Sequence, residues 1–422
     1  MNSGYQFDLM PLDTPDDSPA WAEYLDIFRF SFLDQRATDE GVAVYRAHRR
    51  EDKAVLGRVT TGGPGLDGRV AVAGFAAAPT RINCGRGLVD ALVINTIAVR
   101  PSHRRRGLLK LMMREQLDAA RARGMSLATL TASEATIYGR FGFGITTHTH
   151  PVHVDTRRLV FRPDVPVAGG SIEYVHPSFL KDHWHRLVTE HQLRYRGAVS
   201  HQNAHFLMDT GQWDSSENGP SRSLRCVVHF DDDGVVDGFA LFVPKGWDDT
   251  PITSEVRKVC AADQSVNRAL WKAMAEMDLV ERLIYPLSPP GDPLAASLVD
   301  PWAVQAQAGD DPVWLRILDL PSAVAQRQFD GEGTVVVAIT DSMGYCEGTW
   351  RIRAEAGHGT AEPSEAEPEV RLPVDALAAM WHGDRTASEL ALSGLLDGAP
   401  AAIGRLSRLF QVDEPPMNLA TF

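Results

Sequence analysis

Four consecutive basic residues and a glycine form the part of this sequence with the clearest potential for chemistry. They are His103, Arg104, Arg105, Arg106 and Gly107. Arginine presents a planar fork of N–H donors that matches phosphate oxygens, and glycine has no Cβ to keep a phosphate away from the backbone. A helix that begins here would add unpaired N–H groups and a positive dipole end. The predicted ligand of this loop is a pyrophosphate.

The flanking residues predict the two elements that such a loop needs. Residues 93–99 (VINTIAV) are rich in β-branched side chains and predict a buried strand. Residues 108–123 carry apolar side chains at helical spacing and are followed by Gly124, which is typical of a helix end. The basic loop is therefore expected at a strand-to-helix turn, where backbone N–H groups are available to an anion.

An arginine-rich run is also typical of a solvated face or of a nucleic-acid patch. The chain has 55 acidic and 42 basic residues, and its net charge of −13 argues against a general affinity for nucleic acid. The loop has neither the G-x-G-x-x-G nor the G-x-x-x-x-G-K-[ST] pattern, which argues against the usual dinucleotide and Walker sites. These observations favour a different phosphate-bearing ligand.

The loop resembles the phosphate motif of the GNAT acetyltransferases, in which R-x-x-G-x-[GA] after a strand binds the pyrophosphate of coenzyme A. Residues 104–109 (RRRGLL) match that motif except at Leu109, where the family has a small residue. The HRRRGLL form of the loop, residues 132–144 (ASEATIYGRFGFG), the length of 422 residues and the terminal Phe422 resemble the Eis group of these N-acetyltransferases. The likeness is specific in the N-terminal third and at the last residue.

The resemblance implies acetyl-CoA as co-substrate, no metal, and a set of contacts. The residues implied for the coenzyme are Ile97, Ala98, Val99, Arg104, Arg105, Gly107, Leu108 and Ser133. Arg106 is expected to point elsewhere. Phe32 and Asp34 are implied as apolar and acidic walls of the substrate pocket. Thr421 stands where the family has a penultimate glutamate, and this difference bears on the acidity of the pocket and on the preference for polyamines.

Tyr138 and Phe422 fit the acid and the base that amine acetylation requires. Removing a proton from a lysine-type amine of pKa ~10.4 in neutral water costs about 4 to 5 kcal/mol. An α-carboxylate of reference pKa ~3.5 becomes a better base when aromatic rings desolvate it, and Phe422 supplies both groups. The phenol of Tyr138, with pKa near ~10, suits protonation of the departing thiolate. Against these roles, Tyr138 is typical of a core aromatic residue, and chain ends are usually disordered.

The composition predicts a soluble, cytoplasmic protein without metal, membrane or nucleic-acid partners. The N-terminal segment MNSGYQFDLMPL has neither a basic n-region nor an apolar h-region, and the longest apolar run, residues 70–78, is far shorter than the ~20 residues of a membrane helix. Four cysteines form no C-x-x-C pair, which favours a reducing compartment and gives no zinc framework. His201 and His205 are spaced as neighbours on a surface helix.

The predicted fold is α/β (α+β) with three domains. Residues 1–162 are expected to form a catalytic GNAT domain, residues 163–300 a second, degenerate GNAT fold, and residues 301–422 a sterol-carrier-protein-like domain whose terminus reaches the active site. Residues 262–270 (ADQSVNRAL) have no glycine equivalent to Gly107, so the second domain should not bind pyrophosphate. Residues 357–368, rich in Gly, Ala, Glu and Pro, predict a mobile loop or hairpin tip.

The predicted function is acetyl transfer from acetyl-CoA to primary amines of small polycationic, aminoglycoside-like molecules. Direct attack in a ternary complex is expected, because no cysteine near the motif suggests an acyl-enzyme. One alternative is a protein-lysine acetyltransferase. Another is a non-catalytic binding protein for hydrophobic ligands with a vestigial GNAT domain, in which the last three helices line an empty pocket. The family forms hexamers, so the resemblance implies a homo-oligomer.

Overall fold

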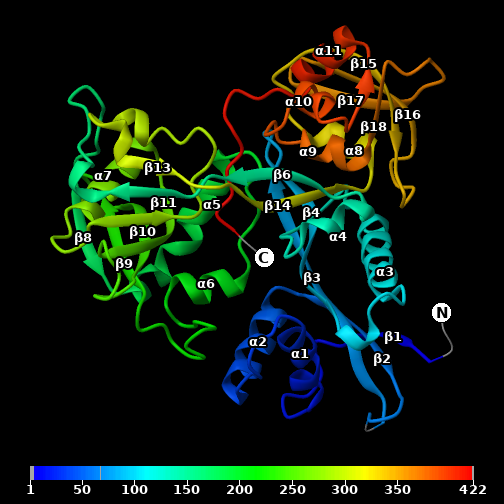
Figure 1. Ribbon diagram of the computed structural model, residues 1–422, viewed down its shortest axis with the longest axis horizontal. Coiled ribbons are helices and arrows are strands. Elements are labelled where there is room, and N and C mark those ends of the chain that lie inside the picture. Colours follow the sequence, from blue (N-terminus) through cyan, green and yellow to red (C-terminus); the bar gives the residue numbers. More distant parts are fainter. Residues whose placement is uncertain (1–3, 67, 421–422) are drawn as a thin grey trace. The chain divides into compact units, whose positions relative to one another are not determined.

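The computed structural model describes residues 4–66 and 68–420 (Figure 1). These residues fall into two compact units. The first unit comprises the residues up to 146 together with residues 313–414. The second comprises residues 147–312 together with residues 415–420.

A seven-stranded mixed sheet lies at the centre of the first unit. Across the sheet, the strands are β1 (Gln6–Met10), β2 (Val55–Thr61), β3 (Val70–Asn83), β4 (Leu88–Val99), β5 (Leu127–Leu130), β14 (Asp310–Ile317) and β6 (Gly144–Thr149). β4 and β5 run parallel, whereas β3 pairs antiparallel with β4 and β14 pairs antiparallel with β5. The β-branched run that predicted a strand forms the second half of β4.

Helices cover this sheet through the apolar positions that the sequence provides. They are α1 (Ala20–Ser31), α2 (Asp39–Glu51), α3 (Leu108–Ala122) and α4 (Ala135–Tyr138). α1 packs on β3 and β4, where Trp21 and Ile27 have no exposed surface. α3 packs on the same two strands and buries Met112, Met113 and Leu117 completely. The helix predicted after the basic loop is therefore confirmed at its first residue and ends one residue earlier.

The C-terminal part of the first unit contains a second, five-stranded sheet. Its strands, in order, are β17 (His358–Pro363), β16 (Gly348–Glu355), β15 (Gly333–Thr340), β18 (Val370–Pro373) and β19 (Asp397–Gly398), and its helices are α8 (Leu320–Gln326), α9 (Val374–Ala379), α10 (Ala387–Leu392) and α11 (Pro400–Phe410). Residues 357–368 were expected to form a mobile loop or a hairpin tip: Gly357 does lie in the tip of the β16–β17 hairpin, but His358–Pro363 form β17, which pairs antiparallel with β16. Pairing with β16 stabilises β17 as a strand, although few of its side chains are apolar.

A buried arginine fills the core between these helices and strands. Arg327 has no exposed surface, and its guanidinium donates to the carbonyl oxygens of Trp381 at 2.8 Å and Phe410 at 2.9 Å. The guanidinium carbon also lies 4.4 Å from the ring centroid of Phe329. Trp381 and Phe410 are buried as well. This packing disfavours the alternative in which the last three helices line an empty pocket for a hydrophobic ligand.

The second unit is built on another seven-stranded sheet. Its strands, in order, are β13 (Val304–Ala306), β7 (Val152–Asp155), β12 (Arg282–Tyr285), β11 (Thr253–Ala261), β10 (Val236–Pro244), β9 (Arg225–Phe230) and β8 (Ser171–Val175), and its helices are α5 (Trp184–Arg194), α6 (Asn203–Asp209) and α7 (Gln264–Ala275). The acidic stretch between β9 and β10 is a hairpin turn, closed by the Gly234 backbone N–H donating to the Asp231 carbonyl at 3.0 Å.

Two strands lie outside the sheet that their place in the sequence predicts. β7 falls within the expected first domain, residues 1–162, yet it lies between β12 and β13 in the sheet of the second unit. β14 falls within the expected third domain, residues 301–422, yet it lies between β5 and β6. Each of the two seven-stranded sheets therefore contains a strand from beyond the expected domain boundary.

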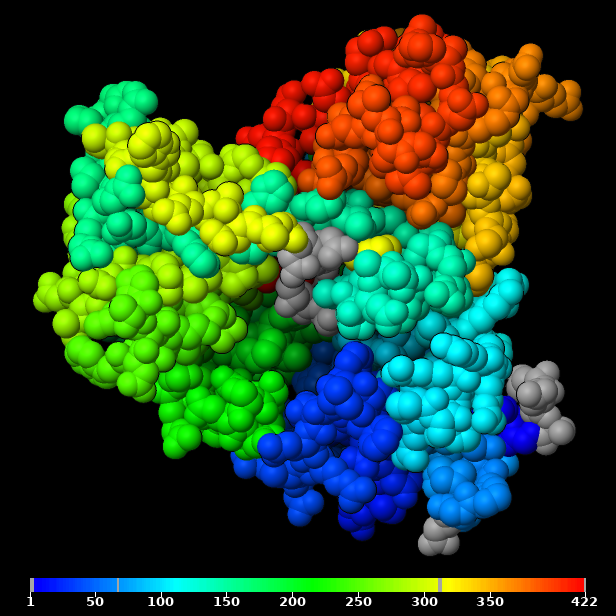
Figure 2. Space-filling view, viewed as in Figure 1, coloured from blue at the N-terminus to red at the C-terminus, as the bar shows by residue number. Residues whose placement is uncertain are grey.

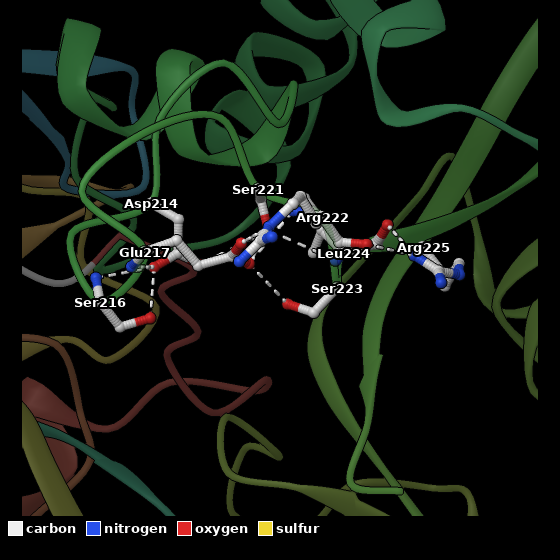
Figure 3. Close-up of polar contacts among 8 residues, drawn as sticks. All are labelled: Asp214, Ser216, Glu217, Ser221, Arg222, Ser223, Leu224 and Arg225. Atoms are coloured by element: carbon white, nitrogen blue, oxygen red, sulfur yellow. Dashed lines mark hydrogen bonds and ion pairs between the residues drawn. The ribbon is translucent and has the colours of Figure 1, made fainter.

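A long connection between α6 and β9 is ordered by two carboxylates (Figure 3). Asp214 Oδ1 accepts from the Ser216 backbone N–H at 2.8 Å, and Glu217 Oε2 accepts from Arg222 Nε at 2.8 Å. The hydrogen bond from Arg222 lowers the pKa of Glu217 to about 2.

The prediction that His201 and His205 share a surface helix is wrong. Helix α6 begins at Asn203, and His205 is buried, with its Nδ1 accepting from the Gln202 backbone N–H.

Residues 415–420 belong to the second unit and pack into its core. Leu419 and, in part, Met417 join an apolar cluster that contains Trp184 and Phe239. Asn418 is 4% exposed, and its Oδ1 accepts from the Val199 backbone N–H at 3.0 Å. The chain is therefore anchored two residues before the structure's last described position.

Candidate active site

The basic loop lies between the end of β4 and the start of α3, as predicted. A short 3-10 turn, Pro101–His103, leads into it, and Gly107 is the N-cap of α3 with φ of 81°. No side chain caps this helix, and a Cβ placed on Gly107 would meet nothing within 4 Å. An uncapped helix start beside open space leaves backbone N–H donors available to an anion. The left-handed φ explains why glycine is favoured there.

The three arginines of the loop point to different places. Arg104 and Arg105 line a cavity of about 870 Å³, whereas Arg106 is not among its lining residues. Arg106 instead donates to the Tyr5 hydroxyl at 2.7 Å and to the Ser102 carbonyl oxygen at 3.1 Å. Only two of the three guanidinium groups therefore border the space above the helix start.

His103 also borders this cavity, but its ring is occupied. Its Nδ1 shares a hydrogen bond of 2.8 Å with the Tyr5 hydroxyl. Partial burial, together with the charges of Arg106 and Arg100, lowers the pKa of His103. The imidazole is thus neutral near pH 7 and serves the turn rather than acting as a further cation.

Strand β4 presents an unpaired edge to the same cavity. An extra residue, Asn95, interrupts its register with β3, which jumps from the Ala76–Thr96 pair to the Ala77–Ile94 pair. The pairing of β4 with β5 ends at Ile94 and Leu130, and within the described residues the rest of β4 pairs with β3 alone. Beyond the bulge and the end of β5, this part of β4 has a strand on one side only among the described residues, and its residues Ile97, Ala98 and Val99 line the cavity.

Tyr138, at the end of α4, is both a buried aromatic residue and part of the cavity wall. Its side chain is 5% exposed and makes edge-to-face contacts with the rings of Phe143 and Trp314, at centroid distances of 6.3 and 6.4 Å. It nevertheless lines the cavity, as Ser133 does. Burial raises the pKa of Tyr138, and a hydrogen bond with the Ser133 side chain offsets part of that rise. The phenol is protonated throughout the neutral range.

The predicted substrate residues are only partly brought together. Phe32 lines the cavity and is half exposed. Asp34 is not among the lining residues, because its carboxylate pairs with Arg29 and accepts from the Gln35 backbone N–H at 3.0 Å. Phe422 and Thr421 lie outside the described residues. Figure 2 shows the blue surface of α1 beside the cyan surface of the loop and α3, from which the two sides of the cavity are built.

Among the lining residues that the sequence did not assign to the site, Ser342 and Met343 lie far in sequence from every predicted site segment of the N-terminal domain. They lie in the connection between β15 and β16 of the C-terminal domain, about two hundred residues after Tyr138 in the chain. Nothing in their types signals a site. The indirect signal is the run of glycines at 139, 142 and 144, which is typical of close backbone approach by another element.

The second unit has the corresponding strand-to-helix turn, at β11 and α7, but its helix start is already occupied. The Asp263 carboxylate accepts from the backbone N–H groups of Ser265 at 2.7 Å and Val266 at 3.0 Å. Arg268 donates to the Pro166 carbonyl oxygen at 2.6 Å. The protein's own anion fills the place that a phosphate would take, which agrees with the prediction for residues 262–270.

Comparison with known proteins agrees with this geometry. Residues 17–146 and 197–317 match acetyltransferase (GNAT) domains, and residues 320–418 match the sterol carrier protein domain. An uncharacterized N-acetyltransferase of Streptomyces avermitilis is 32% identical over 330 residues, which cover 76% of this chain and 79% of that protein. N-acetyltransferase Eis of Mycobacterium bovis is 29% identical over 371 residues, which cover 85% and 84% of the two chains. The chain belongs to the Eis-type N-acetyltransferases of the GNAT family.

The fold of this Eis-type acetyltransferase is that of its solved relatives. The crystal structure of Eis1 from Mycobacterium abscessus aligns with a TM-score of 0.79 at 22% identity, covering 99% of this chain and 100% of that one. The prediction of two tandem GNAT folds followed by a sterol-carrier-protein-like domain is confirmed.

Acetyl-CoA is the co-substrate that a GNAT fold implies, and the residues of the cavity fit it. Within residues 4–66 and 68–420, no group of three or more His, Cys, Asp or Glu side chains is arranged to hold a metal ion. None of the helices in that part of the chain has the length and apolarity needed to cross a membrane.

Proposed function

We propose that this Eis-type enzyme acetylates primary amines of small polycations of the aminoglycoside class, by direct attack of the amine in a ternary complex. One observation carries the proposal. A single cavity of about 870 Å³ joins the arginine loop, the unpaired edge of β4 and the phenol of Tyr138. A cavity of this size suits a large co-substrate together with a small second substrate.

The coenzyme end of the cavity supports binding of a pyrophosphate. The N–H groups at the start of α3 and the guanidinium groups of Arg104 and Arg105 are donors for its oxygens. The backbone at Ile97 to Val99 offers strand-type hydrogen bonds to the amides of a pantetheine arm. When bound, acetyl-CoA supplies an activated thioester.

Tyr138 is proposed as the acid that meets the departing thiolate. A buried phenol with a raised pKa carries its proton at neutral pH, so it donates a hydrogen bond without prior ionisation. Edge-to-face contacts with the rings of Phe143 and Trp314 hold the phenol ring in place. A fixed donor needs no reorganisation as negative charge develops on sulfur.

The terminal carboxylate of Phe422 is proposed as the base, on the strength of the sequence. An α-carboxylate that is desolvated by an aromatic ring has a raised pKa, and this makes it a better base. In this role, the substrate enters the cavity as an ammonium ion, and the carboxylate then removes its proton.

A cationic substrate is supported by charge. The chain carries a net charge of −13, which attracts polycations over a distance of about a Debye length. Glu134 is the acidic residue among the described residues that line the cavity. Asp34, paired with Arg29, would have to change partner before it contributed to an acidic wall.

Direct transfer is supported by the position of the cysteines. All four are buried, and among the described residues that line the cavity there is none. We further propose a homohexamer in the cytoplasm, as the family resemblance implies.

The proposal is tested by measuring release of coenzyme A with a panel of acceptors: an aminoglycoside, a linear polyamine, a simple monoamine and a lysine-containing peptide. We expect kcat/KM to be highest for the polycations and to fall as salt is added, and we expect intersecting initial-rate plots for the two substrates. A preference for the peptide would support the protein-lysine alternative instead. Absence of turnover with every amine would contradict the proposal.

A further inference from the structure

A loop of the C-terminal domain forms part of the wall of the active-site cavity. This loop, residues 341–346, connects β15 to β16, and its residues Ser342 and Met343 line the cavity. The Ser342 hydroxyl donates to the carbonyl oxygen of Arg140 at 2.9 Å. Arg140 lies in the 3-10 turn Gly139–Phe141, which begins at the residue after Tyr138. The contact therefore joins the C-terminal domain to the segment that carries the proposed acid.

The loop is held rigid by a buried carboxylate. Asp341 Oδ1 and Oδ2 accept from Arg316 Nη2 at 2.7 and 2.6 Å, and they also accept from the backbone N–H groups of Met343 at 3.0 Å and Cys346 at 2.9 Å. Neither Asp341 nor Arg316 has exposed side-chain surface. A buried carboxylate that accepts four hydrogen bonds, two of them from backbone N–H groups of the loop, fixes the backbone around it. Ser342 thus projects from a defined position.

The same loop also reaches the helix that begins at the phosphate site. The Tyr345 hydroxyl donates to Asp118 Oδ1 of α3 at 2.6 Å. The guanidinium carbon of Arg121, also on α3, lies 5.7 Å from the ring centroid of Tyr345. One loop therefore contacts both the α3 side and the Tyr138 side of the cavity.

The glycines after Tyr138 are explained by this packing. A Cβ on Gly142 would lie 2.7 Å from Val374 Cγ1, and a Cβ on Gly144 would lie 2.0 Å from the Asp375 carbonyl oxygen, both in the first turn of α9. No side chain fits at either position without displacement of the C-terminal domain. The segment from Tyr138 to Gly144 is thus packed, backbone against neighbour, on that domain.

We propose that Ser342 is a positioning residue for Tyr138, and that the C-terminal domain, through Ser342, sets the orientation of the catalytic phenol. This inference rests on the proposed function, in which Tyr138 meets the departing thiolate. Ser342 acts through the Arg140 carbonyl, which fixes the turn that follows Tyr138. Ser342 is itself exposed, so its hydrogen bond contributes little to the free energy of unfolding. A displacement of the phenol by about 1 Å, in contrast, lowers the rate by up to about a hundredfold.

The test is a set of steady-state measurements on the full-length enzyme. Ser342→Ala is expected to lower kcat by about tenfold while the KM for acetyl-CoA stays within about twofold and the melting temperature is unchanged. Ser342→Thr keeps the hydroxyl and is expected to restore most of the rate. The matched control is Ser393→Ala, because Ser393 also donates to a backbone carbonyl, that of Leu390 at 2.9 Å, but does not line the cavity.

A double-mutant cycle separates this inference from the proposed function. In a Tyr138→Phe background, Ser342→Ala should lower kcat no further, because the group that it positions is gone. A normal kcat for Ser342→Ala, an effect on KM alone, or a full additional loss in the Tyr138→Phe background would each overturn the positioning role and leave the role of Tyr138 standing. A normal kcat for Tyr138→Phe alone would overturn the proposed acid, and the inference with it.

Discussion

Arg316 and Asp341 form an ion pair with no exposed surface on either side chain, and it joins β14 to the C-terminal domain. Burial alone would raise the pKa of Asp341, but the hydrogen bonds and charge of Arg316 outweigh it, so the pKa is lowered. Removing one partner of such a pair leaves an unpaired buried charge, which is strongly destabilising. The sterol-carrier-protein-like domain is thus an integral part of the first unit.

Loss of either arginine that lines the cavity should weaken coenzyme binding. Arg104→Ala and Arg105→Ala are each expected to raise the KM for acetyl-CoA by about tenfold or more with little change in kcat, because a charge-assisted contact to phosphate is lost. Arg106→Ala is the matched control, since this arginine bonds to Tyr5 and Ser102. Equal effects for all three variants would contradict the placement of the phosphate site.

Replacing the proposed acid should affect the chemical step. Tyr138→Phe is expected to lower kcat by about 10- to 1000-fold while the KM for acetyl-CoA is largely kept. Burial raises the pKa of this phenol, so its proton is present at every pH up to about 10 and the wild-type rate should show no loss from this group below that pH. Rates with a series of leaving-group thioesters would check the assignment, because the variant should depend more steeply on thiol acidity.

The terminal carboxylate can be displaced without changing any side chain. Appending one glycine after Phe422 moves the carboxylate by about 3.5 Å and should lower kcat by at least tenfold at unchanged melting temperature. Normal turnover by the extended chain would remove Phe422 from the mechanism.

The second unit should be sensitive to acid. His191 is 4% exposed, and burial, followed by the charges of Lys258 and Arg194, lowers its pKa to about 3. In the unfolded chain this histidine binds a proton below pH ~6.5, whereas in the folded protein it stays neutral down to about pH 3. Protonation therefore favours the unfolded state, and the free energy of unfolding decreases as the pH falls from 6.5 towards 3. At pH 5 the loss is about 2 kcal/mol.

His191→Leu should therefore narrow the difference in stability between pH 7 and pH 5, as measured by unfolding in denaturant at both values. The quantity compared is the change in the free energy of unfolding between pH 7 and pH 5 in each protein, so the test does not require the two proteins to be equally stable. Parallel losses in both proteins would contradict a neutral buried imidazole.

Gly144 should tolerate no side chain. Gly144→Ala would place a methyl group 2.0 Å from the Asp375 carbonyl oxygen, so we expect a destabilisation of about 1–3 kcal/mol or more. Gly139→Ala is the control, because its nearest neighbour, Asp375 Oδ2, lies 3.9 Å away and its φ of −56° suits alanine. Thermal unfolding of the two variants checks the difference, and equal melting temperatures would contradict the close packing of α9.

Local patterns predicted the local part of the site. The strand at residues 93–99, the turn at Gly107 and the helix from Leu108 follow from side-chain type and spacing, since those interactions are close in sequence. Neither the exchange of β7 and β14 nor the presence of Ser342 in the wall could be predicted. Both depend on which surfaces meet across long stretches of chain, and strand composition does not specify a partner. Asp34 shows a further limit of prediction from sequence. It is close in sequence to Phe32, which lines the cavity, but its carboxylate forms an ion pair with Arg29.

The cap on α7 has a consequence for ligand stoichiometry. At the start of α7 the N–H groups of Ser265 and Val266 already donate to the carboxylate of Asp263, whose negative charge would repel a second pyrophosphate. Calorimetric titration with coenzyme A should therefore saturate at one equivalent per polypeptide. A second equivalent of bound coenzyme A would show that the two GNAT folds both bind the acyl donor, despite the carboxylate of Asp263 at the start of α7.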